Sequence, residues 1–206
     1  MRGGLIVGLM ACTVLVSGCG YGSLQQQEEA VKTSWSEVVS QYQRRADLIS
    51  SLADSVKGFA ASQQALIGAT EAGARSGSQP TTPAVLNDPA AFASYQAMQD
   101  QLARSLGNLI GLAASYPQLQ SDANFVDLRA QLADTENRIA DARNRYMEAV
   151  RTFNTTVRTF PTDLTARMFD FHPKPNLPAT AASGKIGLFS GAYSPARESV
   201  SDVSRK

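Results

Sequence analysis

Residues 122–161, DANFVDLRAQLADTENRIADARNRYMEAVRTFNTTVRTFP, are the stretch that decides the fold. Their apolar side chains recur in alternating steps of three and four residues, which keeps one face of a helix turned toward its neighbours. This stripe comprises Phe125, Leu128, Leu132, Ile139, Ala142, Tyr146, Ala149, Phe153 and Phe160, with Thr135 and Thr156 in register as polar interruptions. We therefore expect a long helix that begins near Ser121 or Asp122 and is stopped by Pro161.

A second stripe of this kind precedes it, over residues 24–72. Ser23 and Gln26 resemble a capping box at its start, and no proline occurs in residues 20–79. The apolar positions are Val31, Trp35, Val38, Tyr42, Ile49, Leu52, Val56, Phe59 and Leu66, with Arg45 and Gln63 as polar interruptions. The pattern predicts one uninterrupted helix about 73 Å long, at ~1.5 Å per residue.

Between these two segments the sequence predicts a loop and a third long helix. Residues 73–87 are rich in Gly, Ser, Thr and Pro, as loops are. Asp88 and Pro89 then form an N-cap and a first helical residue, and the helix is predicted to run to Pro117. Its stripe is Phe92, Tyr95, Leu102, Leu106, Leu109, Ala113 and Tyr116.

After Pro161, residues 162–169 can form one or two helical turns. The prolines and glycines of residues 172–206 predict a mostly extended tail. The predicted fold is therefore all-α, with three long helices, a short C-terminal helix and an extended C-terminal tail.

The N-terminus resembles a bacterial lipoprotein signal. Arg2 precedes a largely apolar run at residues 5–16, which is well short of the ~20 residues of a membrane-crossing helix. The run ends in Val16-Ser17-Gly18-Cys19, the aliphatic, small, small, cysteine order of a lipobox. We expect a signal peptide at 1–18, lipid on Cys19, a flexible spacer at 19–23, a helical domain at 24–171 and the tail at 172–206. Since processing removes Cys12, disulfides are not expected.

The interior of the predicted helices also resembles the LemA family. The carrying segments are Gln41-Tyr42-Gln43-Arg44-Arg45-Ala46-Asp47-Leu48-Ile49, Tyr116-Pro117-Gln118-Leu119, Asn124-Phe125-Val126-Asp127-Leu128, Glu136-Asn137-Arg138-Ile139-Ala140, Ala142-Arg143-Asn144-Arg145-Tyr146, Val150, Phe153-Asn154 and Phe160-Pro161. The resemblance covers residues 21–175. It implies a long antiparallel helical bundle attached to an envelope membrane by its N-terminus, and it implies no enzyme activity. Met147, Phe153 and Asp170 depart from the family's usual asparagine, tyrosine and glycine.

The residue types offer little for catalysis, cofactors or metals. His172 is the sole histidine and falls in a predicted loop, so a solvated side chain is expected there rather than a general base. Asp134, Glu136 and Asp141 share a helix with arginines, which indicates an ion-paired surface rather than a metal site. We therefore expect no enzyme, no cofactor and no small-molecule substrate. The formal net charge of +1 offers no bulk attraction to nucleic acid.

Two sets of residues are candidates for interaction or specificity. The second helix is shorter than the first, which predicts that Val31, Trp35, Val38 and Tyr42 form an exposed interaction face, unless residues 162–171 and the tail fold back over it. A set of polar residues flanks the stripes and either sets helix register in a buried network or forms a recognition face. These residues are Arg44, Arg45, Asp47, Asn137 and Arg138.

The combined expectation is a membrane-tethered, non-catalytic scaffold or interaction protein. Its partners would be a second copy of the chain or another envelope protein. The alternative is a chaperone-like adaptor for an envelope protease or transport machine, with the exposed stripe as a peptide groove. Gly20 follows the lipidated cysteine where aspartate would signal retention. We therefore expect the periplasmic side of the outer membrane in an organism with two membranes.

Overall fold

The computed structural model describes residues 2–79 and 81–178, with side chains from residue 20 onward. The described residues form helices, short 3-10 turns and connecting segments, and they contain no strand. The all-α prediction is therefore confirmed for this part of the chain. The predicted tail over residues 179–206 lies outside the described residues.

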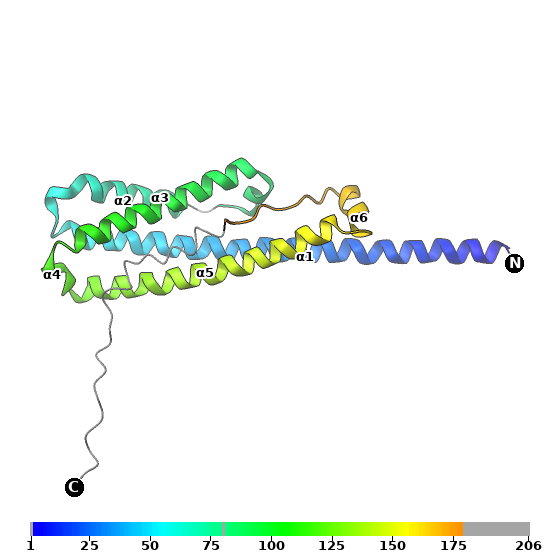
Figure 1. Ribbon diagram of the computed structural model, residues 1–206, viewed down its shortest axis with the longest axis horizontal. Helices are drawn as coiled ribbons and strands as arrows, with labels where there is room; N and C mark the ends of the chain where they lie inside the picture. Colours follow the sequence, from blue (N-terminus) through cyan, green and yellow to red (C-terminus); the bar gives the residue numbers. More distant parts are fainter. Residues whose placement is uncertain (1, 80, 179–206) are drawn as a thin grey trace, which may run out of the picture.

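Helices α1 (Arg2–Lys57) and α5 (Ala123–Arg158) form the long axis of the molecule and lie antiparallel (Figure 1). Their pairing runs from Ser55 and Asn124 at one end, 3.4 Å apart between Oγ and Nδ2, to Glu37 and Arg145 further along, 3.0 Å apart between Oε2 and Nε. At the start of α5, Asp122 accepts a 2.9 Å hydrogen bond from the Phe125 amide, as its sequence position predicts.

The prediction of one helix over residues 24–72 is wrong, because the chain turns at residues 58–60. The amides of Phe59 and Ala60 both donate to the carbonyl of Val56, which closes α1 just before Gly58. After the 3-10 turn η1 (Ala61–Gln63), helix α2 (Gln64–Gly77) folds back along α1. Glycine is a poor interior helix residue, so Gly58 favours a break that the apolar stripe alone does not reveal.

The connection to the next helix is shorter than the predicted loop over residues 73–87. Helix α2 continues to Gly77, and the 3-10 turn η2 (Pro83–Asn87) leads into α3 (Pro89–Ala113). Gly77 has a packing role, since a Cβ there would lie 2.8 Å from Cδ2 of Leu102 on α3. The Asp88 cap is confirmed: its carboxylate accepts from the amides of Ala90 and Ala91 at 2.9 and 3.1 Å.

Pro117 does not simply end the second predicted helix. Helix α3 stops at Ala113, and Pro117 begins the single turn α4 (Pro117–Gln120), which leads to α5. The chain thus runs up α1, back along α2, up α3 and down α5, an arrangement with four helical segments in cross-section (Figure 1). The helical architecture is as expected, but α2 is a separate helix that the sequence interpretation merged into the first helix.

The short helix α6 (Thr162–Met168) agrees with the prediction, whereas the boundary of the tail does not. Lys174 and Leu177 are buried, so residues 171–178 belong to the folded domain although they have no regular secondary structure. We call residues 171–178 the C-terminal strap. It begins after Asp170, whose φ of 61° is a conformation that favours glycine.

The core consists of two apolar clusters stacked along the bundle. The first includes Trp35, Phe92 and Tyr146, and the second includes Ile49, Leu106 and Phe125. Buried polar side chains from three helices lie between them: Arg45, Gln99 and Thr135. On α5 the buried positions after Tyr146 are Val150, Phe153 and Val157 rather than Ala149 and Thr156, and the predicted Phe160 lies past the end of α5 and is exposed. A straight helix of 3.6 residues per turn drifts out of a strict heptad in this way.

Candidate functional site

The predicted interaction face lies inside the bundle. Val31, Trp35 and Val38 are fully buried, and Tyr42 is 3% exposed. The indole of Trp35 packs among the rings of Phe92, Tyr95 and Tyr146, with centroid distances of 5.2, 5.7 and 5.3 Å. These four residues are therefore core residues and present no free apolar face.

This burial comes from α5 together with the start of α3, whose Phe92 and Tyr95 pack on Trp35. The expectation of an uncovered stripe compared only the first and second helices, but α5 runs beside α1 as far as α6 (Figure 1). Residues 162–171 cover the stripe only in part: Ala166 is buried, whereas Leu164, Met168 and Phe169 are exposed. The rest of the cover comes from η2, from the start of α3 and from the strap.

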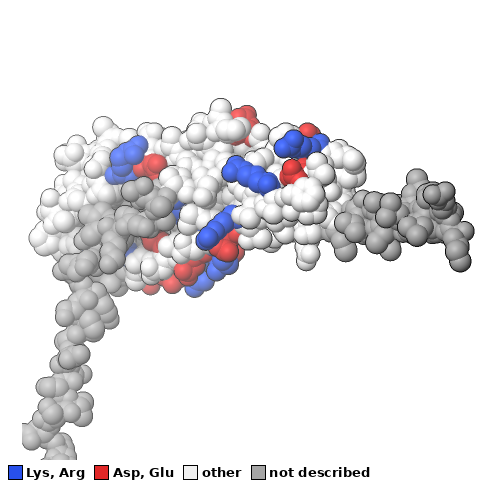
Figure 2. Space-filling model, turned by 45° about the vertical axis from the view of Figure 1, so that its right-hand side comes forward, with Lys and Arg blue, Asp and Glu red and all other residues white. Residues whose placement is uncertain are grey.

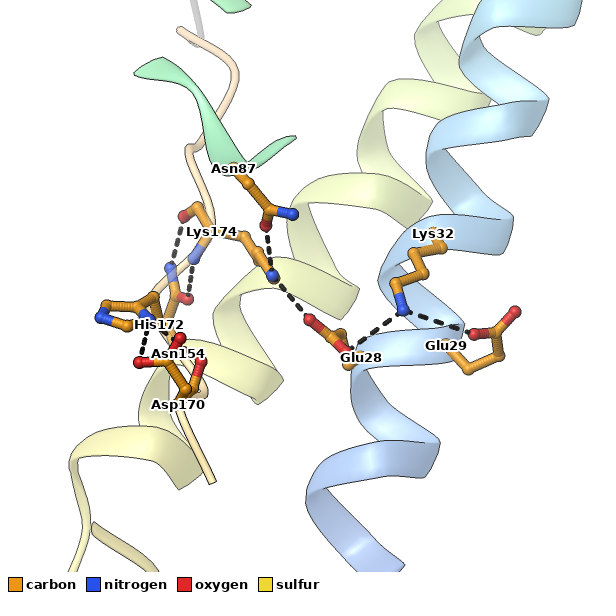
Figure 3. A network of polar contacts seen from close by, with 8 residues as sticks. All are labelled: Glu28, Glu29, Lys32, Asn87, Asn154, Asp170, His172 and Lys174. Atoms are coloured by element: carbon orange, nitrogen blue, oxygen red, sulfur yellow. Dashed lines mark hydrogen bonds and ion pairs between the residues drawn. The ribbon is translucent and has the colours of Figure 1, made fainter. Parts of the chain in front are cut away.

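The strap is held by a network centred on Lys174 (Figure 3). The Lys174 ammonium lies 2.6 Å from Oε1 of Glu28 on α1 and donates to Oδ1 of Asn87 at 2.7 Å. The Asn154 side chain on α5 accepts from the Lys174 amide at 2.8 Å and donates to its carbonyl at 2.9 Å. One residue of the strap is thereby bonded to three separate parts of the bundle.

Two further side chains of the core hold the strap beyond Lys174. The Tyr146 hydroxyl donates to the carbonyl of Pro175 at 2.7 Å, and Arg143 donates to the carbonyl of Pro178 at 3.0 Å. Leu177 fills the first apolar cluster between these bonds. The sequence interpretation missed this site because a lysine between two prolines is typical of a solvated tail. The signal that could have found it is Leu177, an apolar residue in an otherwise polar segment.

The electrostatics of the network favour its ionised form. Burial of Glu28 by itself raises the pKa of its carboxyl group, but the hydrogen bonds and charges of Lys174 and Lys32 outweigh it, so the pKa lies below its ordinary value. Burial likewise raises the pKa of the Tyr95 and Tyr146 hydroxyl groups. Both tyrosines therefore remain neutral at physiological pH.

Of the polar residues predicted to set register or form a recognition face, Arg45 is the one that is buried. It donates to Oε1 of Gln99 on α3 at 2.7 Å and lies 3.4 Å from Oε1 of Glu136 on α5. Arg44, Asp47, Asn137 and Arg138 are exposed. Arg45 thus links three helices at one level, which is the geometry of a register-setting contact.

With this geometry in place, comparison with known protein families assigns residues 34–186 to the LemA family. The chain is a member of the LemA family. A search of the curated proteins found no match. In this LemA protein, several residues that carried the resemblance make the interior contacts described above: Tyr42, Arg45, Arg143, Tyr146 and Asn154.

The surface of this LemA protein carries charges of both signs. On the face in Figure 2, basic and acidic residues lie side by side rather than in separate patches. His172 is exposed, with Nδ1 3.0 Å from the carbonyl oxygen of Asp170. Within residues 20–178, apart from the undescribed residue 80, no cluster of His, Cys, Asp and Glu is placed to hold a metal ion. Among the described helices, none combines the length and apolarity needed to cross a bilayer.

The predicted lipid site lies where α1 leaves the bundle. The flexible spacer predicted for residues 19–23 is instead part of α1, which passes without a break through Cys19 (Figure 1). Gly20 already packs against α6, since a Cβ there would lie 3.4 Å from Oγ1 of Thr165 and 3.5 Å from Cγ2 of Thr162. Leu24, one turn further, is fully buried. The helix therefore joins the folded domain directly after Cys19.

Proposed function

We propose that this LemA family protein is a lipoprotein of the bacterial cell envelope, tethered through Cys19, and that it works as a non-catalytic helical scaffold. The observation that carries the proposal is the unbroken course of α1 through Cys19 into the bundle, with Gly20 packed on α6. Cleavage before Cys19 would leave the lipid on the first turn of a structural helix. A domain built directly on its anchor suits a protein that holds a surface in a fixed place at the membrane.

The way the buried charges are used supports a structural rather than a catalytic role. Arg45, Arg143 and Lys174 each bond to side chains or carbonyls of other elements of the same chain. Charged groups engaged in this way order the fold, whereas a catalytic group must face a substrate. The scaffold would therefore act through its outer surface, toward a second copy or another envelope protein.

The alternative function, a chaperone-like adaptor, depended on an exposed apolar groove along the first helix. Val31, Trp35 and Val38 are fully buried, so they offer no such groove. The scaffold proposal does not need the groove, because helix surfaces with charges of both signs also bind proteins specifically. We therefore retain the scaffold as the proposed function.

Mass spectrometry of the protein purified from its membranes tests the anchor. We expect the mature N-terminal peptide to begin at a diacylated Cys19, and a Cys19→Ser variant to keep residues 1–18 and carry no lipid. Detection of Met1 on an unacylated wild-type chain would contradict the proposal. Because Gly20 is not aspartate, we propose the outer membrane as the destination in an organism with two membranes. Fractionation that finds the protein wholly in the inner membrane would refute this sorting step alone.

A further inference from the structure

Large apolar side chains are exposed mainly at one end of the bundle. Of the seven large hydrophobic residues that are exposed among residues 20–178, excluding the undescribed residue 80, five lie on or beside α6. They are Tyr21, Phe160, Leu164, Met168 and Phe169, and we call them the α6 patch. Phe160 and Met168 are 76% and 78% exposed, which is unusual for such large apolar groups. The other two, Phe59 and Val126, lie at the opposite end.

The patch is continuous with the start of the folded domain. Leu164 and Met168 are four residues apart on α6 and share one face of that helix. The rings of Tyr21 and Phe169 are 4.7 Å apart between centroids, which joins α1 to the end of α6. Gly20 contacts Thr162 and Thr165 on the same helix. The exposed apolar residues therefore lie on or near α6, the helix that stands beside α1 where α1 departs toward Cys19 (Figure 1).

Helix geometry brings this patch to the lipid surface if Cys19 is the anchor. From Cys19 to Tyr21 the helix rises only about 3 Å. The polar layer of one bilayer leaflet is about 5–8 Å thick, as the difference between the whole bilayer and its hydrocarbon core indicates. A side chain that lies beside Tyr21 is thus within the headgroup layer when the acyl chains of Cys19 are in the hydrocarbon. The contacts of Gly20 and Tyr21 with α6 keep this spacing short.

The charges around the patch do not select an anionic surface. Arg158 and Arg167 are accompanied by Asp163 and Asp170, and Arg167 lies 3.8 Å from Asp163 between Nη2 and Oδ2. Aromatic and long aliphatic side chains with balanced charges are typical of segments that rest in the interface between lipid and water. Burial of apolar area, rather than attraction of opposite charge, would drive such binding.

We propose that the α6 patch inserts into the headgroup layer of the membrane that holds Cys19 and acts as a second attachment point for the domain. The proposal rests on the proposed function, because the tether is what brings α6 to the lipid. Two attachment points, the acyl chains and α6, restrict rotation of the bundle about its tether. The bound surface is the lipid interface itself, with no requirement for anionic headgroups.

Fluorophores placed at two exposed positions of the full-length lipoprotein test this. The variants are Met168→Cys in the patch and, as the matched control, Phe59→Cys at the other end, each labelled with a polarity-sensitive dye. The proteins are processed in cells, purified and reconstituted into vesicles of zwitterionic lipid. We expect blue-shifted emission at position 168, quenching by lipids that carry a nitroxide near the headgroup, and protection from iodide. At position 59 we expect aqueous emission and full quenching by iodide.

The possible results separate the insertion from the anchor. Iodide quenching at both positions, with the protein still bound to vesicles, would overturn insertion and leave the anchor intact. Protection from both iodide and the nitroxide lipids at position 168 would indicate a protein contact, such as a second copy, and would also overturn it. Wild-type protein treated with the same dye tests the anchor. A Cys19 that carries lipid has no free thiol and cannot react with the dye. A wild type that takes up dye and leaves the vesicles would refute the proposed function and the insertion together.

Discussion

At the scale of single residues, the structure depends on a few buried charges whose partners come from distant parts of the chain. The Lys174 side chain is 5% exposed and lies between Glu28 and Asn87, more than eighty residues away. An ammonium group in this position is stabilising only while its partners remain, because the cost of removing it from water is several kcal/mol. Lys32 binds the same glutamate from an exposed position, with its side chain 38% exposed.

This pair of lysines gives a prediction with a built-in control. Lys174→Met should lower the free energy of unfolding by about 1.5–3 kcal/mol at neutral pH, the range for hydrogen bonds to charged groups. Lys32→Met should cost less than about 1 kcal/mol, as exposed ion pairs do. Urea unfolding followed by Trp35 fluorescence measures both. If the two substitutions lowered the free energy of unfolding equally, the contacts of Lys174 would stabilise the fold no more than an exposed ion pair does.

The pH dependence of the stability of these variants tests whether the ion pair with Glu28 causes the loss. The folded-state pKa of Glu28 is below its ordinary value, so its ionised form contributes stability above the unfolded-state pKa. That contribution is lost as the pH falls through the lowered pKa and the carboxyl group takes up a proton. The stability difference between the wild type and Lys174→Met should therefore shrink as the solution is acidified below the ordinary range of glutamic acid. A difference independent of pH would point to packing instead.

At the scale of helices, the stripe on α1 is the element whose role the structure changes most. Val31→Glu and Val38→Glu place charges in a closed core and should each lower the melting temperature sharply, whereas Thr33→Glu on the exposed face should change it little. Thermal melts by circular dichroism compare the three variants. If the buried substitutions kept the melting temperature and instead dissociated an assembly, the stripe would be an interface after all.

Local signals in the sequence predicted two of the three long-helix starts. Asp88 was identified as a cap and the last long helix was expected to begin near Ser121 or Asp122, because such signals depend on the next few residues alone. The start predicted from the capping box of Ser23 and Gln26 is wrong, since α1 passes through both residues without a break. The turn at Gly58 was not predicted, because Phe59 and Leu66 continue the heptad spacing although Phe59 is exposed and Ile67 is the buried residue. A break of this kind depends on how α2 packs on α1, which periodicity within one helix does not contain.

The candidate sites also differ in whether a local signal or a contact between distant residues defines them. The proposed lipobox around Cys19 is a contiguous motif, so sequence reasoning can predict it without a structure. The strap cannot be found in that way, because Lys174 is fixed by Asn87 and Asn154 and has no periodic pattern around it. The error over Val31 to Tyr42 arose from comparing the lengths of two helices alone, since α5, η2, the start of α3 and the strap all contribute to the cluster that covers these residues.

At the scale of the whole molecule, α1 and α5 connect the two apolar clusters across the layer of Arg45, Gln99 and Thr135. The clusters should therefore unfold together. Leu109→Ala, in the second cluster, should cost about 2–5 kcal/mol, and the neighbouring exposed Asn108→Ala less than about 0.5 kcal/mol. Trp35 lies in the first cluster, so its fluorescence and far-ultraviolet circular dichroism should give the same lowered midpoint. A Trp35 transition that kept the wild-type midpoint would show that the clusters unfold separately.

If Cys19 is the lipid anchor, the unbroken course of α1 would also set a height above the membrane. From Cys19 to Lys57 the helix rises about 57 Å at 1.5 Å per residue, and α5 stiffens it over most of that length. An upright bundle would thus hold Phe59 and Val126, the exposed apolar residues of its far end, at a nearly constant distance from the lipid. A membrane-bound protein that binds there would have to extend to that distance. The length of α1 would therefore limit its partners to proteins that reach the same distance from the lipid.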